Sequence, residues 1–170
     1  MKKCVLFLSI IMVSCSTMLD SSTEKSDVNA VVNSWHLAAA KADFKTYFDL
    51  MTADGVFIGT DPTENWQNQA FRDFSTPFFE KGKAWNFRSL ERSIYFSTDK
   101  KTAWFDELLS TQMKICRGSG VLLKTNGKWK IAHYVLSMTV PNENTDEVIK
   151  LKTEFENRII EKLDKKSQGK

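Results

Sequence analysis

The pattern of apolar positions changes twice along the chain. From residue 28 to residue 42, and again from 44 to 51, apolar residues recur every three or four positions. That spacing predicts two amphipathic helices, the first centred on Trp35. From residue 84 to residue 139, runs rich in β-branched and aromatic residues alternate with turn signals, which predicts four antiparallel strands. Helices followed by an antiparallel sheet indicate an α+β domain.

Two further helices are predicted by shorter signals. One follows Pro62 and should stop near Ser75, because Pro77 lacks a backbone donor and clashes with the preceding turn. The other follows Pro141 and carries an apolar stripe among balanced charges. The stripe consists of Val148, Leu151, Phe155, Ile159 and Leu163. We expect this helix to pack on its own domain, with binding of a partner as the alternative.

The last two strands join at Asn126-Gly127, and two turn types fit these residues. A two-residue type I′ turn places Lys124 opposite Trp129, whereas a three-residue loop places Leu123 opposite Trp129. The two choices differ by one position, which exchanges the faces of the strand. We expect the three-residue loop, because it pairs large apolar residues with each other.

That register turns three polar residues, Arg117, Ser119 and His133, toward the covered face of the sheet. A buried arginine requires a carboxylate, because an unpaired charge is costly in a medium of low dielectric constant. The preceding strand offers Asp106 or Glu107, of which only one points inward, and alternation does not decide which. The opposite face then carries an apolar group that is unusual on the surface of a monomer. This group consists of Tyr134, Leu136 and Met138.

The first residues have the pattern of a secretory signal. Lys2 and Lys3 precede an apolar run from residue 5 to 13, which is too short to span a bilayer as a mature helix. Residues 12–15, ending in Cys15, resemble the lipobox of bacterial lipoproteins, whose cysteine carries lipid. An ordinary signal peptide with an incidental cysteine is the alternative. We expect a signal peptide at residues 1–14, a flexible tether at 15–26, and a lipid anchor that holds the protein on a membrane of the bacterial cell envelope, on the periplasmic or outer-membrane side.

Composition bears on the number of domains, on nucleic-acid binding and on metal binding. The chain has 170 residues, which suits one domain with its own core. Without Lys2 and Lys3 it has 22 basic and 21 acidic residues, so net charge gives no indication of nucleic-acid binding. Cys116 is the one cysteine that remains in the domain, and we expect it to be a small buried residue. Histidine or cysteine pairs at metal-ligand spacing do not occur, so neither a metal nor another cofactor is expected.

Two segments resemble the SnoaL-like branch of the nuclear-transport-factor-2-like superfamily: Ala-Trp-Phe-Asp-Glu at 103–107 and Gly-Lys-Trp-Lys-Ile at 127–131. The resemblance covers residues 27–141 and leaves 142–170 as a C-terminal helix and frayed tail. It implies a cone-shaped, cystatin-like roll, in which a curved antiparallel sheet wraps around the N-terminal helices and leaves an apolar pocket open at one end. Enzymes of the superfamily use a carboxylate or a His/Asp pair inside the cone. Here His133 matches the inward histidine, while Val135 stands where many relatives have a second one.

Three functions fit these features, and binding of a small apolar or aromatic molecule in the cone is the one we expect. Its candidate lining consists of Trp35, Phe57, Trp66, Trp104, Arg117 and Ser119. The second function is an isomerase or lyase in which His133 is the acid or base and Asp106 or Glu107 orients it. The third is a homodimer formed through the outer sheet face. Without any chemistry, the same polar residues are explained as a satisfied buried network that fixes the strand register.

Overall fold

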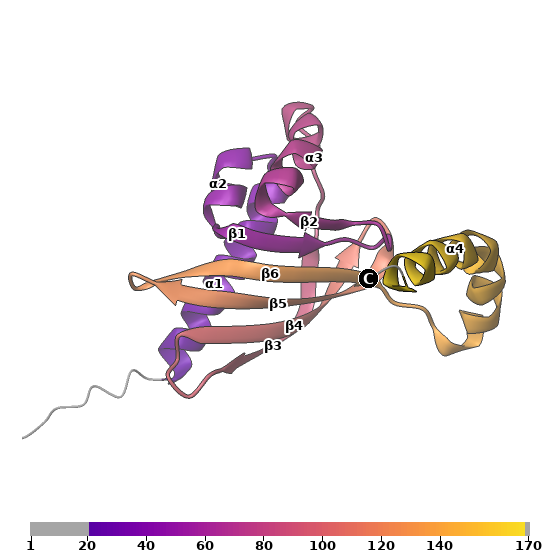
Figure 1. Ribbon diagram of the computed structural model, residues 1–170. Helices are drawn as coiled ribbons and strands as arrows, with labels where there is room; N and C mark the ends of the chain where they lie inside the picture. Colours follow the sequence, from indigo (N-terminus) through magenta and orange to yellow (C-terminus); the bar gives the residue numbers. More distant parts are fainter. Residues whose placement is uncertain (1–20, 169–170) are drawn as a thin grey trace, which may run out of the picture.

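The computed structural model describes residues 21–168, which form a curved six-stranded sheet with the N-terminal helices packed against one face (Figure 1). The helices are α1 (Ser21–Ala40), α2 (Phe44–Asp49), α3 (Asn68–Glu80) and α4 (Thr145–Gln168), and a short 3-10 helix, η1 (Asn142–Asn144), precedes α4. The strands are β1 (Met51–Ile58), β2 (Asn65–Gln67), β3 (Arg88–Phe96), β4 (Thr102–Thr111), β5 (Lys114–Thr125) and β6 (Lys128–Met138). This arrangement confirms the predicted α+β roll.

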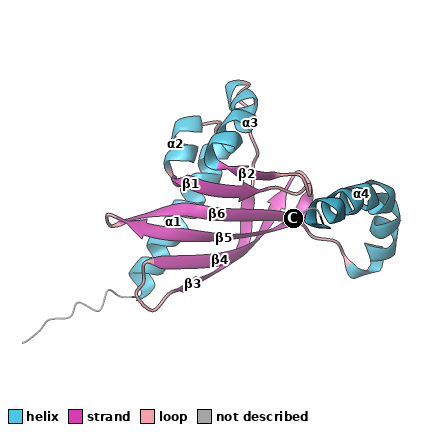
Figure 2. Cartoon of the chain, in the orientation of Figure 1, coloured by secondary structure: helices cyan, strands magenta, loops and turns pink. Residues whose placement is uncertain are grey.

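The sheet has the strand order β2-β1-β6-β5-β4-β3 (Figure 2). Strands β3 to β6 form the predicted antiparallel meander, and β1 joins it by lying parallel to β6. A register shift between Ser89 and Glu91 marks a bulge. The sequence predicts a bulge near these residues, because Trp85 and Phe87 alternate in one phase and Ile94 and Phe96 in the other. Bulges increase the local bend and twist of a strand, which suits a sheet that curls around helices.

The core lies between α1 and the inner face of the sheet and is built mainly of aromatic rings. The indole of Trp35 stacks on Tyr47 of α2, with ring centroids 4.7 Å apart, and meets Tyr134 of β6 edge-on at 4.8 Å. Phe57 of β1 stacks on Phe71 of α3 at 4.2 Å. All five rings are buried, so most of the hollow of the cone is filled by the protein's own side chains.

The predicted flexible tether is wrong over residues 21–26, because α1 already begins at Ser21. The helix starts this early because Glu24 is anchored to the sheet. Its buried carboxylate accepts a hydrogen bond from Trp129 Nε1 at 2.9 Å and forms an ion pair with Lys124. These contacts fix the first turn of α1 against the β5–β6 hairpin. The rest of the predicted signal and tether, including Cys15, lies outside the described residues.

The predicted register of the last hairpin is also wrong. Asn126 and Gly127 both have positive φ, at 52° and 74°, and form the two-residue turn that sets Lys124 opposite Trp129. A bulge between Val121 and Leu122 then shifts the pairing by one residue. Beyond the bulge the inward residues of β6 are therefore Tyr134 and Leu136, both of which were expected on the outer face.

Two predictions about helices need correction as well. Helix α3 continues through Pro77 instead of stopping near Ser75, and it ends one turn later at Glu80. Pro77 removes one backbone donor, but Phe79, which lies beyond it in the helix, is buried in the core and favours continuation of the helix. Helix α4 is present after Pro141 as predicted, but none of its residues is buried against the domain.

Candidate functional site

A buried carboxylate, Glu107, is the centre of the polar chemistry inside the cone. Along β4 it alternates in phase with Ala103, Phe105 and Leu109, which are all buried, and only 1% of its surface is exposed. Asp106 takes the opposite phase and points outward. The structure thus decides between the two carboxylates that alternation had left open, and Glu107 is the inward one.

Three elements bring hydrogen-bond donors to this carboxylate. From α1, His36 Nε2 lies 2.8 Å from Oε1. From β6, the Tyr134 hydroxyl donates to the same oxygen at 3.0 Å. From β3, Arg92 donates to Oε2 through Nε at 2.9 Å and Nη2 at 2.7 Å, a two-pronged contact that guanidinium groups make with carboxylates.

This environment keeps Glu107 ionised. Burial raises the pKa of its carboxyl, but the hydrogen bond and charge of His36 and the charge and hydrogen bonds of Arg92 outweigh burial and lower it below its usual value. Burial, followed by the negative charge of Glu107, raises the pKa of Tyr134 well above 10. An ionised carboxylate only accepts hydrogen bonds, so His36 Nε2 must carry a hydrogen.

The second ring nitrogen of His36 has no such partner. The residue is 4% exposed, and its Nδ1 is buried without a hydrogen-bond partner among the residues the structure describes. A neutral imidazole that carries its hydrogen on Nε2 has a free lone pair on Nδ1. In the neutral form of His36, the His36–Glu107 dyad therefore holds Nε2 on a carboxylate and leaves the buried Nδ1 with a lone pair and no partner.

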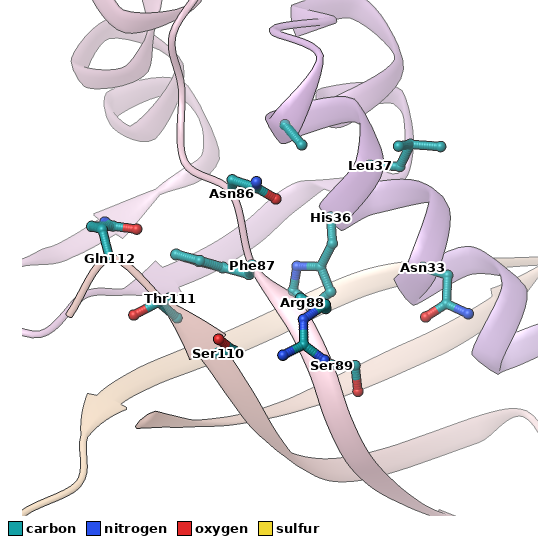
Figure 3. Close-up of a pocket in the computed structure, with 11 residues that line it drawn as sticks. Asn33, His36, Leu37, Asn86, Phe87, Arg88, Ser89, Ser110, Thr111 and Gln112 are labelled. Atoms are coloured by element: carbon teal, nitrogen blue, oxygen red, sulfur yellow. The ribbon is translucent and has the colours of Figure 1, made fainter. Parts of the chain in front are cut away.

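His36 forms part of the wall of a cleft of about 750 Å³ at one end of the cone. In Figure 3 the side chain extends from α1 toward Phe87 and Arg88 at the start of β3, while residues of the β4–β5 turn form the far side. Eight of the eleven lining residues have polar side chains, and none of them is Asp or Glu. It consists of Asn33, His36, Leu37, Ala40, Asn86, Phe87, Arg88, Ser89, Ser110, Thr111 and Gln112.

The aromatic residues expected to line one ligand pocket do not lie around a common cavity. Trp35 is 1% exposed and packs in the core, and Trp104 lies on the outer face of the sheet, 45% exposed and stacked on Tyr95. Phe57 and Trp66 do line a cavity, but its volume is about 180 Å³, below the roughly 300 Å³ typical of small-molecule pockets. The large cleft is lined by none of these tryptophans.

The predicted polar set on β5 and β6 does not enter the cone. Ser119 pairs with Val135 and His133 with Val121, so that, with the corrected register, Arg117, Ser119 and His133 share the outer face. Arg117 lies 3.9 Å from Asp106 there, and both side chains are about half exposed. The roles predicted for these residues depended on an inward orientation. The two-residue turn turns Arg117 and Ser119 outward, and the bulge between Val121 and Leu122 does the same to His133.

Sequence reasoning missed His36 and Arg92, although a signal for each was present. Glu24, Val28, Val32 and His36 follow one another at intervals of four, which places them along one helix face, and all four are buried. Arg92 precedes Ile94 by two positions, so that it shares the inner phase of β3 after the bulge. Polar residues that continue an apolar stripe were the sign of a buried site.

Neither a metal site nor a membrane-spanning helix is found within residues 21–168. No group of three or more His, Cys, Asp or Glu residues in this part of the chain is placed to hold a metal ion. Cys116 is buried, as predicted. No helix in the described range has the length and apolar character needed to cross a membrane.

The curved sheet, the enclosed helices and the buried carboxylate at one end of the hollow define the class of cone-shaped α+β domains. The family model described as the SnoaL-like domain matches residues 28–141. The chain therefore belongs to the SnoaL-like domain family. Among curated proteins, none matches it significantly.

Solved structures resemble the chain in fold. An NTF2-like protein of unknown function from Pseudomonas putida KT2440 is 13% identical, with a TM-score of 0.61 over 73% of this chain and 92% of that one. A proposed dehydratase of the NTF2-like family from Streptomyces avermitilis is 16% identical, with a TM-score of 0.58 over 71% and 99%. The association domain of CaMKII from C. elegans is 17% identical, with a TM-score of 0.55 over 69% and 97%. At these identities the likeness shows the fold alone.

Proposed function

We propose that the domain binds a small organic molecule in the cleft beside His36 and moves a proton on it, as an isomerase or lyase does. The observation that carries this proposal is that His36, a residue of the cleft wall, has an unpartnered Nδ1 while its Nε2 is held by an ionised, buried carboxylate. Because Nδ1 is itself buried, the bound molecule must displace neighbouring side chains of the wall to reach it. Simple apolar binding in the cone has less support, because aromatic side chains fill most of that space.

The chemistry needs only the residues present. His36 Nδ1 removes a proton from a carbon or oxygen of the bound molecule, and the imidazolium that forms is stabilised by the negative charge of Glu107. The same nitrogen then returns the proton, either to another atom of the molecule, which isomerises it, or to a departing hydroxyl, which leaves as water. Arg92 and Tyr134 act as positioning residues, since both contact the carboxylate and not the cleft.

The relatives are compatible with this proposal. The Streptomyces avermitilis protein is described as a proposed dehydratase, a reaction class that requires proton transfer. Its likeness to this chain supports the fold, and the dyad supports the reaction class.

Proton exchange into D₂O tests the proposal without knowledge of the substrate. We would incubate the protein with a panel of small ketones, among them acetone, dihydroxyacetone and acetophenone, and measure loss of α-protons by NMR. His36→Gln should reduce the exchange rate at least about 100-fold, the usual contribution of a general base. His133→Gln is the matched control, because this histidine lies on the outer face, and it should retain the wild-type rate. Equal losses in both variants, or no exchange above buffer with any ketone, would contradict proton transfer at His36.

The membrane location is a separate proposal. We infer from residues 1–15 that Cys15 carries lipid and anchors the protein to the bacterial cell envelope. Residues 15–20 lie between the proposed anchor and the first described residue, and six residues span at most about 20 Å. Partition into a detergent phase tests the anchor: wild type should enter it, and Cys15→Ser should stay in the aqueous phase. Unchanged partition would refute the lipid anchor.

Pairing of two copies through the outer sheet face is a second candidate function. Tyr95 and Trp104 favour it, because they are 46% and 45% exposed and stack on one another on this face. The similar CaMKII structure is an association domain by its description. Trp104→Glu should weaken self-association measured by sedimentation, and an unchanged sedimentation profile would exclude pairing through this face.

A further inference from the structure

Helix α4 is the longest helix among the described residues, yet no other described element packs on it closely enough to bury any of its residues. It spans 24 residues, none of them buried, and it stands apart from the sheet beyond the end of β6 (Figure 1). It also lies outside residues 28–141, which the SnoaL-like domain model matches. Large apolar side chains on it are open to solvent, with Leu151 84% exposed and Leu163 58% exposed. Exposure of this kind on one contiguous helix is typical of an interaction surface.

Five of the seven large apolar residues of α4 lie along one face, and Ile149 and Ile160 lie to one side of it. Val148, Leu151, Phe155, Ile159 and Leu163 follow one another at intervals of three or four, so they form a single stripe along the helix axis. In proteins, most of the stability of a helix comes from packing of its amphipathic face and not from intrinsic propensity. We therefore expect a covering surface about as long as the stripe, which from Val148 to Leu163 measures about 23 Å at 1.5 Å per residue.

The charges of α4 indicate what that surface is. The first half, residues 145–156, has four acidic and two basic residues, whereas the second half, 157–168, has two acidic and four basic residues. The helix as a whole has no net charge, which gives no attraction to an anionic bilayer. A second copy of α4 laid antiparallel would place each negative half against a positive half, while a parallel copy would place like charges together.

We infer that α4 pairs with α4 of a second copy in antiparallel orientation, so that the chain forms a dimer through this helix. Such a pair has twofold symmetry, in which each contact occurs twice. Phe155 then lies near the symmetry axis and meets its own counterpart, and Val148 near one end lies opposite Leu163 of the other copy. This interface is separate from the cleft and from the outer sheet face.

Disulfide cross-linking in the full-length protein tests both the pairing and its direction. Two differently tagged copies, one Val148→Cys and the other Leu163→Cys, would be co-expressed and oxidised in isolated membranes. The antiparallel pair brings these positions within disulfide reach, so the mixed dimer should form at least about tenfold more than either homodimer. Asn157→Cys, on the opposite helix face, serves as the control, and the wild-type chain gives the background from its native cysteines.

A charge placed in the stripe separates this interface from other contacts. Phe155→Glu should abolish the mixed cross-link, whereas Asn157→Glu, with the same change of charge on the polar face, and Trp104→Glu, on the sheet, should preserve it. Circular dichroism of the variants confirms that the domain is folded. The inference is overturned if the Val148 homodimer forms as well as the mixed dimer, if no cross-link exceeds background, or if folded Phe155→Glu still cross-links.

Discussion

Replacement of Glu107 by glutamine tests the buried network most directly. The amide has nearly the same shape as the carboxylate but removes the charge on which three donors converge. The Arg92 side chain is only 5% exposed, so its guanidinium would remain buried without a carboxylate. Removal of one member of a buried ion pair typically costs about 3–5 kcal/mol. This is a large part of the roughly 5–15 kcal/mol that stabilises a domain.

Urea denaturation at pH 7 measures this loss, with Asp106→Asn as the matched control. Asp106 is the neighbour of Glu107 on β4, but it is half exposed and 3.9 Å from Arg117, so its replacement should cost less than about 1 kcal/mol. A loss below about 1 kcal/mol for Glu107→Gln, or equal losses in both variants, would refute the central role given to the buried carboxylate.

The pH dependence gives an independent check on the same variant. The pKa of Glu107 is lower in the folded protein than its ordinary value of 4.5, so between these two pKa values the unfolded chain binds more protons than the folded one. Its contribution to stability is therefore complete above the unfolded pKa and is lost as the pH falls through the folded pKa. Wild type should lose stability more steeply than Glu107→Gln below about pH 4.5. Parallel acid denaturation curves would contradict this.

Three further predictions follow from the contacts around the network and the first helix. Gly118→Ala should destabilise the fold by about 1–3 kcal/mol, because its added Cβ would lie 2.2 Å from the Tyr134 hydroxyl; Ser119→Ala, on the outer face, should be nearly neutral in the same urea assay. The phenol of Tyr134 should ionise at a higher pH in the folded protein than in the unfolded one, and an ultraviolet titration in which all tyrosines ionise over the same range in both states would disagree. Glu24→Ala removes the acceptor of the Trp129 indole, so amide hydrogen exchange in the first turn of α1 should accelerate; unchanged protection would show that the contact does not fix this turn.

The sequence by itself determined the elements and most of the fold. Apolar residues at helical spacing placed α1 and α2, alternation with turn signals placed β3 to β6, and the change of phase near Ser89 located a bulge. These features depend on neighbours in the chain, which a single sequence displays in full. The amphipathic pattern of α4 belongs to the same group, but what covers its stripe depends on surfaces outside that pattern.

The orientation of the polar residues was decided only by the tertiary structure. The rule that large residues pair with large ones favours the other register for β5 and β6, yet Tyr134 lies opposite Gly120 and Leu136 opposite Gly118. The inner face of a strongly curved sheet is crowded, and a Cβ at Gly120 would approach the Phe105 ring to 2.7 Å.

Because the inner face is crowded, large side chains at the centre of the cone need small residues opposite them on the next strand. This is the reverse of the expectation that large residues pair with large ones. The bulge between Val121 and Leu122 satisfies this need and turns His133 outward, so the buried acid finds its imidazole on α1 instead. Packing against a distant helix, at a separation of 71 residues between His36 and Glu107, is information that local periodicity does not contain.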